Sequence, residues 1–296
     1  MSKITELTED QKQLMLEVRD EWLSKLKHGT DEKKAVKLVR YVMTDILNMR
    51  MPKVTILDSP MRCQEYANRK LGTKKNYDMS YRADISDYGW VAHYDFFDKI
   101  GVALSDKFKK YRDLVDCNIY SSLQFDKEWV ISRMPTHIRK DGANLSSTDS
   151  AAMEFADGYK LYYIHGVYFG SQYDYNGVKY VKNQLFARHS GMSARQILSV
   201  ENIEQRMALL KTRDTESLFS ELDAKLIHGK TEMGNELYTM DFGLKTPAKV
   251  VRYWCTSTDR EYIKRIPLEF TDADEAQAWS HEFKSVEEYT TNTVES

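Results

Sequence analysis

Two closely spaced glycine turns constrain the fold of this chain more than any other feature of its sequence. Apolar and polar residues alternate over 153–155, the alternation stops at Asp157-Gly158, and it resumes over 161–163. Gly158 accepts a positive φ without a Cβ clash, and Asp157 can bond its own backbone. The pattern therefore predicts a β-hairpin with its turn at Asp157-Gly158.

The same device recurs twice downstream of this hairpin. His165-Gly166 separates two further apolar stretches, and Asn176-Gly177 precedes a strand-like run from Val178. Asn-Gly is a strong two-residue hairpin signal. We therefore predict a central antiparallel β-meander, with β structure running from about Trp129 to Phe186.

Helical signals precede the meander. Thr8 opens a capping box before apolar residues at helical spacing, and a second helix is expected after Thr30. Ser59-Pro60 starts a helix that Gly72 ends, with Cys63, Ala67 and Leu71 on its buried side. A polar, basic loop over 73–82, an aromatic stripe formed by Trp90, Tyr94 and Phe97, and a helix capped by Ser105 complete this part.

Short helices and strands follow the meander. Ser193, Asn202 and Thr215 are expected to cap three helices, and Thr271 a last one. Strands are expected over 237–240, 250–255 and 262–266. We predict an α+β protein with a helical part over 1–120, the β-meander over 121–190 and an α+β part over 191–289, fused into one compact unit. Residues 290–296 are expected to fray.

Charge and motif content exclude several classes of function. The 296 residues carry a formal net charge of -2, so no global attraction to nucleic acid or anionic lipid is expected. Glycine-rich phosphate loops, GxSxG and HExxH are absent, and three cysteines without CxxC spacing suggest neither a disulfide framework nor a zinc site. We expect no cofactor, no metal, no membrane segment and a cytoplasmic location.

A few side chains could carry chemistry, each with a plainer structural explanation. His165 lies at a predicted turn, where it could bond the local backbone or act in a site. Cys255 could be a nucleophile beside a histidine, but its apolar strand favours a buried, inert thiol. The carboxylates Asp149, Glu154 and Asp157 could form an acid and base pair, although strand and turn positions explain them as well.

Two features could mark a binding surface. Tyrosines crowd the meander at positions 159, 162, 163, 168, 173, 175 and 180, either for stacking on a partner or because tyrosine favours strands. Basic clusters occur at Arg69-Lys70 with Lys74 and Lys75, and around Lys109 and Lys110. They could meet nucleic-acid phosphates or form a solvated face.

The order of several segments resembles an uncharacterised domain family of unknown function, found in bacteria and phages and sometimes attached to leucine-rich repeats. The matching segments are PKVTILDSP, SRMP, AAMEFADGYKLYYIHGV, ENIEQR, ELYTMDFG, CTSTDREYIKRIP and EAQAW. Family members usually carry a histidine where Ser146 follows Leu145 here, and Gly-Pro where Ser150-Ala151 stands. The resemblance implies no activity; it implies the extent of the domain and a cytoplasmic origin. A composition rich in tyrosine, lysine and methionine with only five prolines suggests a bacteriophage protein.

Two hypotheses about function follow. The first is non-catalytic recognition of a macromolecular partner, most readily a protein, through the tyrosine-rich β region. The second is an enzyme acting on nucleic acid or nucleotide, with His165, Arg133 and Arg206 in one cleft. The binding residues expected on these grounds are Arg133, Tyr162, His165, Tyr168 and Arg206.

Overall fold

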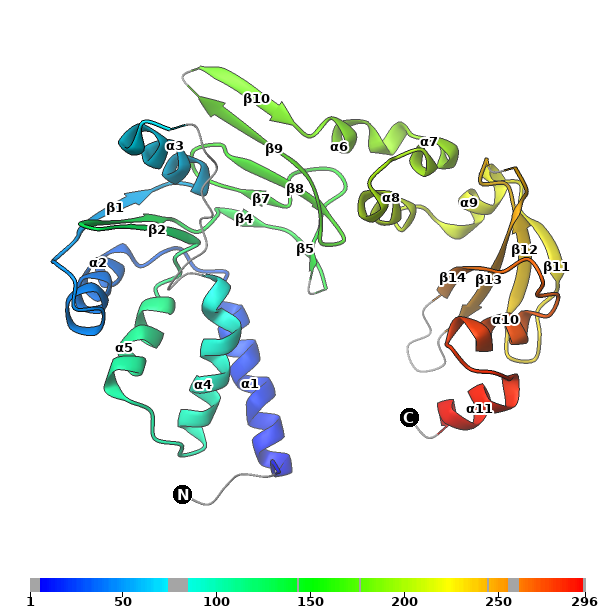
Figure 1. Ribbon diagram of the computed structural model, residues 1–296, viewed down its shortest axis with the longest axis horizontal. Coiled ribbons are helices and arrows are strands. Elements are labelled where there is room, and N and C mark those ends of the chain that lie inside the picture. The colour runs from blue at the N-terminus through cyan, green and yellow to red at the C-terminus, as the bar shows by residue number, and fades with distance from the viewer. Residues whose placement is uncertain are drawn as a thin grey trace. The chain divides into compact units, whose positions relative to one another are not determined.

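The computed structural model describes residues 6–73, 85–142, 144–175, 177–243, 245–254 and 261–294. The fold is α+β, as the sequence predicts (Figure 1). Contacts divide the chain into two compact units, Met1–Phe186 and Ala187–Ser296, which are described one at a time. The boundaries expected near residues 120 and 190 stay predictions.

Five α-helices of the first unit begin after side-chain caps or short turns. They are α1 (Glu9–Lys25), α2 (Glu32–Tyr41), α3 (Pro60–Leu71), α4 (Tyr88–Lys99) and α5 (Asp106–Val115), with a π-helical turn η1 (Val42–Ile46) after α2 and a 3-10 turn η2 (Ile85–Asp87) before α4. Thr8 makes both bonds of the predicted capping box, and Ser59 caps α3. Gly72 ends α3 with φ 63°, so the predicted start and end of this helix are confirmed.

A three-stranded sheet lies between α3 and the main helical core. Its strands are β1 (Lys53–Leu57), β2 (Ser121–Phe125) and β3 (Glu128–Ser132), in the order β1-β3-β2, with β1 parallel to β3. Cys63 and Ala67 of α3 pack on one face, whereas Trp129 and Ile131 join the core of α1, α2, α4 and α5. β structure in this part of the chain begins at Ser121, before the expected start near Trp129, and Trp129 belongs to this sheet and not to the meander. Both faces of β3 are covered, so Trp129, Val130 and Ile131 are all buried, which is typical of a central strand.

The predicted meander forms the second sheet of this unit. Its strands are β4 (His137–Ile138), β7 (Met153–Glu154), β8 (Lys160–Ile164), β9 (Val167–Tyr175) and β10 (Val178–Lys182), antiparallel in the order β10-β9-β8-β7-β4; β5 (Lys140–Asp141) and β6 (Asn144–Leu145) form a small separate hairpin. Gly158 has φ 85°, and Asp157 Oδ1 accepts a hydrogen bond from the Tyr159 amide at 3.1 Å. The Asp157-Gly158 turn is confirmed. Phe186, in contrast, lies on helix α6 (Gln184–Arg188) and not in the β region.

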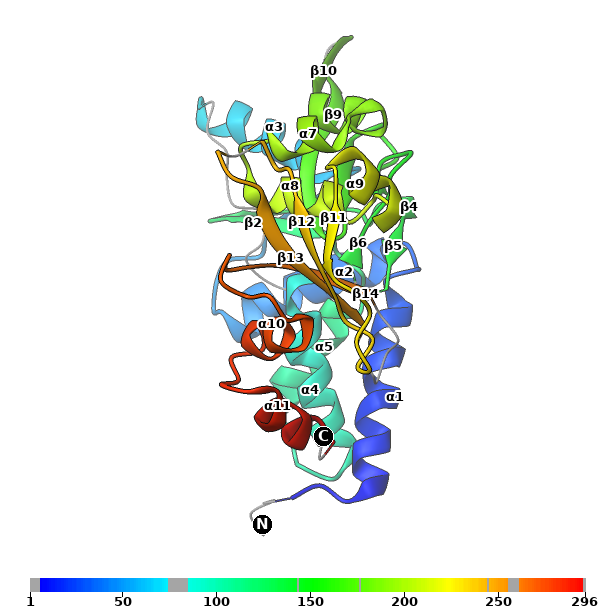
Figure 2. The same cartoon turned by 90° about the vertical axis from the view of Figure 1, so that its right-hand side faces the viewer.

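The second unit is a four-stranded antiparallel sheet with helices on both faces. Its elements are η3 (His189–Gly191), α7 (Ala194–Leu198), α8 (Ile203–Leu210), α9 (Thr215–Glu221), β11 (Lys225–His228), β12 (Glu236–Met240), β13 (Ala248–Trp254), β14 (Glu261–Ile266), α10 (Ala273–Ser280) and α11 (Val286–Val294). Strand order is β11-β12-β13-β14. Ala273 and Ala276 of α10 pack against Leu237 and Val251 on one face (Figure 2). Ala194, Phe219 and Met240 form the core of the other face.

Several local predictions need correction. Asp214, which precedes Thr215, caps α9, and Asp272, which follows Thr271, caps α10. Aspartate is a stronger N-cap than threonine. Leu71, expected on the buried side of α3, is exposed at the last residue of that helix.

The C-terminal tail is ordered further than expected. Helix α11 includes residues 290–294 of the predicted tail, and residues 295–296 lie outside the described residues. The basic loop predicted over 73–82 lies outside the described residues beyond Thr73, as do Lys74, Lys75 and Asn176. Cys255 and the end of its predicted strand also lie outside them.

Candidate functional site

Tyrosine side chains from neighbouring strands form a row on one face of the five-stranded sheet. Tyr163 of β8 lies opposite Tyr168 of β9, and Tyr173 of β9 lies opposite Tyr180 of β10. The ring centroids are 5.3 Å apart in the first pair and 4.9 Å in the second, which is stacked at 10°. We call Tyr163, Tyr168, Tyr173 and Tyr180 the tyrosine surface.

A β-bulge in β9 brings these rings to a common face. The positions of Tyr168 and Tyr173 differ by an odd number, so an unbroken strand would point the two side chains to opposite faces. The register instead shifts between Tyr162, which faces Gly170, and Tyr163, which faces Tyr168. The extra residue is Phe169, and it resets the alternation.

Gly170 makes the bulge sterically feasible. Its φ is +118°, and a Cβ at this position would run into the carbonyl oxygen of Lys182 on β10. Only glycine permits this approach of the two strands. The bulge therefore depends on a residue without a side chain, and the tyrosine surface depends on the bulge.

The rings of the tyrosine surface differ in exposure. Tyr168 is 46% exposed and Tyr180 is 39% exposed, while Tyr163 is half-buried beside Leu161 and Phe155. All residues of β10 are exposed, including Val178 and Val181. Strands β9 and β10 form a hairpin at the end of the sheet (Figure 1).

Tyr162 does not belong to this surface. It points to the opposite face of β8, where it is buried and packs on Phe186 at 4.6 Å between ring centroids. Its hydroxyl lies 3.4 Å from Gln172 Oε1. Tyr162 thus supports the sheet from within. The side chain of Tyr175 lies outside the described residues.

His165 occupies the tight turn that joins β8 and β9. Both turn residues have positive φ, 47° at His165 and 81° at Gly166. The amide of His165 donates to Ser146 Oγ at 3.0 Å, and its Nδ1 lies 3.1 Å from Asp141 Oδ2 on β5. Its polar contacts join the turn to the small β5–β6 hairpin.

The two arginines named from sequence make separate internal contacts. Arg133 pairs with Glu32 at 2.7 Å and with Asp58 at 2.5 Å. Arg206, in the second unit, donates to the carbonyl oxygens of Leu198 and Val200 that end α7. Each guanidinium thus stabilises its own local structure, and Arg133 shares no contact partner with His165.

Lys109 and Lys110 on α5 are paired with acidic neighbours. Lys109 lies 3.6 Å from Asp98, and Lys110 lies 3.9 Å from Asp113. Both are surface pairs on a helical face, where neighbouring carboxylates offset the positive charge. The pairing weakens the case for a phosphate-binding patch at these lysines.

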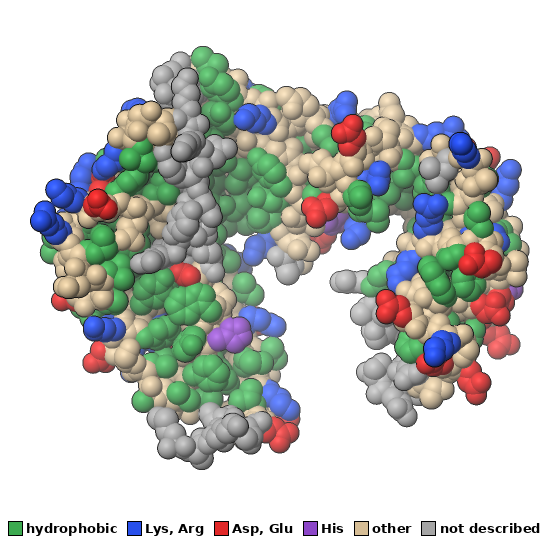
Figure 3. Space-filling view, in the orientation of Figure 1, with side chains coloured by type: hydrophobic (Ala, Val, Ile, Leu, Met, Phe, Trp, Pro, Cys, Tyr) green, Lys and Arg blue, Asp and Glu red, His purple; other side chains and the backbone are tan. Residues whose placement is uncertain are grey.

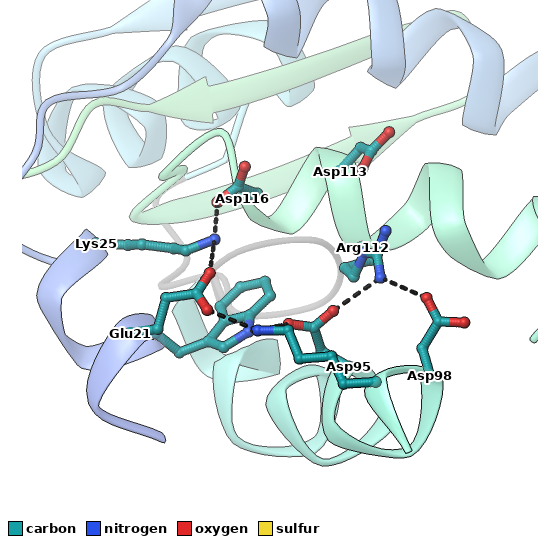
Figure 4. A pocket seen from close by; sticks show the side chains of 9 residues that line it. Glu21, Lys25, Asp95, Asp98, Arg112, Asp113 and Asp116 are labelled. Carbon is teal, nitrogen blue, oxygen red and sulfur yellow. Dashed lines mark hydrogen bonds and ion pairs between the residues drawn. The ribbon is translucent and has the colours of Figure 1, made fainter. Parts of the chain in front are cut away.

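A charged pocket of about 420 Å³ between α1, α4 and α5 was not expected from the sequence (Figure 4). Arg112 bridges Asp95 at 2.8 Å and Asp98 at 3.0 Å. Lys99 bridges Glu21 at 2.7 Å and Asp95 at 3.7 Å. The Lys99 ammonium lowers the pKa of Glu21. Charges of opposite sign alternate through the pocket, which is typical of an ion-pair network that joins neighbouring helices.

Asp95 is the buried centre of this pocket. It accepts a hydrogen bond from the indole nitrogen of Trp22 at 3.1 Å, in addition to its contacts with Arg112 and Lys99. These residues lie far apart in the sequence, so residue spacing does not reveal the cluster. A buried carboxylate with this many donors needs no added ligand to satisfy it.

An apolar groove of about 370 Å³ lies on the other side of α1, against α4. Its lining includes Met15, Leu16, Leu23, Ile85 and Phe96. The predicted stripe of Trp90, Tyr94 and Phe97 is on α4 but is partly exposed, and Phe108 of α5 packs against it. Hydrophobic side chains gather over α4 and α5 in Figure 3.

The chemistry of the described residues gives no metal centre. Within the described ranges, no group of three or more His, Cys, Asp or Glu side chains could hold a metal ion. No helix in the part of the chain described here is long and apolar enough to span a membrane. Burial raises the pKa of the Cys63 thiol and raises that of Cys117 to about 12, so both thiols are unreactive.

Comparison with known proteins adds no relative. No family model matches the chain, and no curated protein and no solved structure matches it. The resemblance described from the sequence therefore stays a prediction.

Proposed function

We propose that this chain recognises a protein partner through the tyrosine surface and catalyses no reaction there. The observation that carries the proposal is the alignment of four tyrosines on one sheet face by a glycine-dependent bulge. Tyrosine rings offer large, rigid contact area with a polar tip, and they are enriched in protein interfaces. The resemblance to an uncharacterised family, a phage origin and a cytoplasmic location accompany the proposal as expectations from sequence.

The contacts of the polar residues favour recognition over catalysis. An acid-base site needs polar groups that converge on open space. Arg133 and His165 instead bind different acidic residues within the first unit. The enzymatic alternative stays a prediction for which these contacts give no support.

A capture experiment with matched variants tests the proposal. The full chain is used as bait in an extract of the encoding organism, beside Tyr168→Ser/Tyr180→Ser and the control Tyr262→Ser. Tyr262 is 41% exposed on β14 in the second unit, so it matches the tested rings in exposure. Captured proteins are quantified by mass spectrometry and their affinity is measured with purified partner.

We expect a partner that binds wild type and Tyr262→Ser equally and binds the double variant at least about tenfold more weakly, because central aromatic residues carry much of the energy of an interface. Equal capture by all three baits would contradict the proposal. A Leu16→Ser bait tests whether the partner binds the apolar groove and not the tyrosine surface. Loss of the partner with this variant alone would assign the binding site to α1 and α4.

Nucleic acid is tested in the same way. Binding through Lys109 and Lys110 would weaken steeply with salt, because each neutralised phosphate releases counterions. We expect no shift of single-stranded or double-stranded DNA or RNA in gels at low salt. A salt-sensitive shift that Lys109→Ala/Lys110→Ala removes would replace the protein partner by a nucleic acid.

A further inference from the structure

Strand β10 leaves one edge of the five-stranded sheet open. Among the described residues it is the terminal strand in the order β10-β9-β8-β7-β4 and pairs only with β9. Its sequence is VKYVK, and every residue in it is exposed. An exposed edge of this kind offers unpaired backbone N–H and C=O groups to another strand.

The turn that precedes β10 determines which backbone groups are open. Tyr175 lies opposite Val178 across the two-residue connection 176–177. In such a hairpin the residues next to the turn form a hydrogen-bonded pair, and bonding alternates along the strand. Val178, Tyr180 and Lys182 therefore bond toward β9, while the backbone groups of Lys179 and Val181 point outward. The outward carbonyl oxygen of Val181 accepts a hydrogen bond from the exposed Gln184 side chain at 2.9 Å, which a second strand would displace.

We propose that two copies of this chain associate by antiparallel pairing of β10 with β10, with Tyr180 on the two-fold axis. In this register the outward backbone groups of Lys179 in each copy bond to those of Val181 in the other copy. It also places Lys182 opposite Val178. No two lysines face each other directly, so the strand is self-complementary in charge.

Neighbouring registers are less favourable. A shift of two residues toward the turn would place Lys179 opposite Lys179, and like charges in that position are destabilising. A shift of two residues away would place Val181 on the axis and extend the pairing beyond Lys182, where β10 ends. Only the register centred on Tyr180 pairs the whole strand.

The same register extends the tyrosine surface. Tyr173 and Tyr180 are already stacked, and a two-fold axis through Tyr180 adds the same two rings from the second copy on the same face. The dimer thus presents a doubled row of aromatic rings, and this consequence rests on the proposed function. Lys179 and Lys182 form no ion pair with any described residue, so their ammonium groups stay in solvent in the dimer.

Disulfide trapping tests the register. Opposed residues in a non-hydrogen-bonded antiparallel pair have Cα atoms about 4.5 Å apart, within the range of about 4.4–6.8 Å that a disulfide needs. Tyr180→Cys is therefore expected to give a cross-linked dimer under mild oxidation. In Lys182→Cys the equivalent residues would be about 13 Å apart, and no cross-link is expected.

Wild type carries Cys63, Cys117 and Cys255 and serves as the background for any cross-link that these native thiols form. Cys63 and Cys117 are free and buried, and Cys255 lies outside the described residues. Absence of a cross-link above this background in Tyr180→Cys would overturn the proposal. A cross-link in Lys182→Cys as strong as in Tyr180→Cys would overturn it as well, because it would indicate random collision.

Sedimentation of the full chain tests the edge itself. The wild-type mass is expected to rise from one chain toward two with concentration. Val181→Pro removes an outward N–H on an edge strand, where proline is tolerated, and is expected to abolish the dimer, whereas Val181→Thr should keep it. A wild-type chain that stays monomeric at all concentrations, or a Val181→Pro variant that dimerises like wild type, would contradict the proposal.

Val181→Pro retains every tyrosine, which separates this inference from the proposed function. If the variant is monomeric and still binds the captured partner, both the dimer and the tyrosine surface are supported. If no variant of the tyrosines affects partner capture but Tyr180→Cys cross-links, the function fails and the dimer stands.

Discussion

Glu128 is a buried carboxylate surrounded by donors from β1 and α3. It is 4% exposed, and it accepts hydrogen bonds from Thr55 and Tyr66 at 2.6 Å and 2.7 Å and an ion pair from Lys70. Burial alone would raise its pKa, but Lys70, Thr55, Tyr66 and Lys53 lower it to about 2. The charged form is therefore stabilised by folding.

We expect this carboxylate to make stability depend on pH. Because the folded pKa lies below the ordinary value of 4.5, its contribution is complete above that value and is lost as the pH falls toward 2. Glu128→Gln should lower the free energy of unfolding by about 1–3 kcal/mol at neutral pH and flatten this dependence. Urea denaturation between pH 2 and 7 measures both; Glu9→Gln, in an exposed pair, is the control. A parallel pH profile in Glu128→Gln and wild type would contradict the assignment.

Gly170 allows a second test at the scale of one residue. Gly170→Ala adds a methyl group against the Lys182 backbone, whereas Gly158→Ala meets nothing within 4 Å although Gly158 also has positive φ. The control variant should cost about 1 kcal/mol through φ alone, and Gly170→Ala should cost more and disorder the pairing of β9 with β10. Thermal melts give the costs, and amide exchange in β10 reports the pairing. Equal costs would show that the close approach is not needed.

At the scale of elements, the Asp157-Gly158 turn also contacts helix α3. Asp157 Oδ2 accepts from Ser59 Oγ at 2.6 Å and lies 3.3 Å from Arg62 Nε, so the turn is bound to the first residues of the helix. Asp157→Ala removes this contact and the bond to the Tyr159 amide; Asp157→Asn keeps a side-chain oxygen for the amide but loses the charge. We expect losses of about 1–3 kcal/mol for Ala and less for Asn, measured by chemical denaturation. An Asn variant as unstable as Ala would mean that the turn bond contributes little.

The sequence predicts local features of this fold better than contacts between distant segments. The Thr8 capping box, the Ser59 and Gly72 ends of α3 and the positive φ of Gly158 depend on residues a few positions apart, so spacing alone predicts them. The parallel pairing of β1 with β3 and the binding of Asp95 to Trp22 join distant segments. For the site, the sequence predicted a tyrosine-rich sheet, but the bulge that decides which rings share a face follows only from the register of β8 and β9.

At the scale of the whole molecule, each unit has a core of its own. Ile131 is fully buried in the first unit, among helices and the three-stranded sheet, and Leu237 is fully buried in the second, beneath α10. Core clusters that share no residues favour local unfolding in separate cooperative units. The two units are therefore expected to lose stability one at a time.

Leu237→Ala should destabilise the second unit by about 2–5 kcal/mol, because the side chain is removed from a site with little room to collapse. Hydrogen exchange followed by mass spectrometry should then show faster exchange over 187–296 and unchanged exchange over 1–186. Ile131→Ala is the matched control and should give the opposite pattern. If either variant accelerates exchange equally in both units, the chain unfolds as one cooperative body, and the single compact unit expected from sequence would describe its energetics better than two.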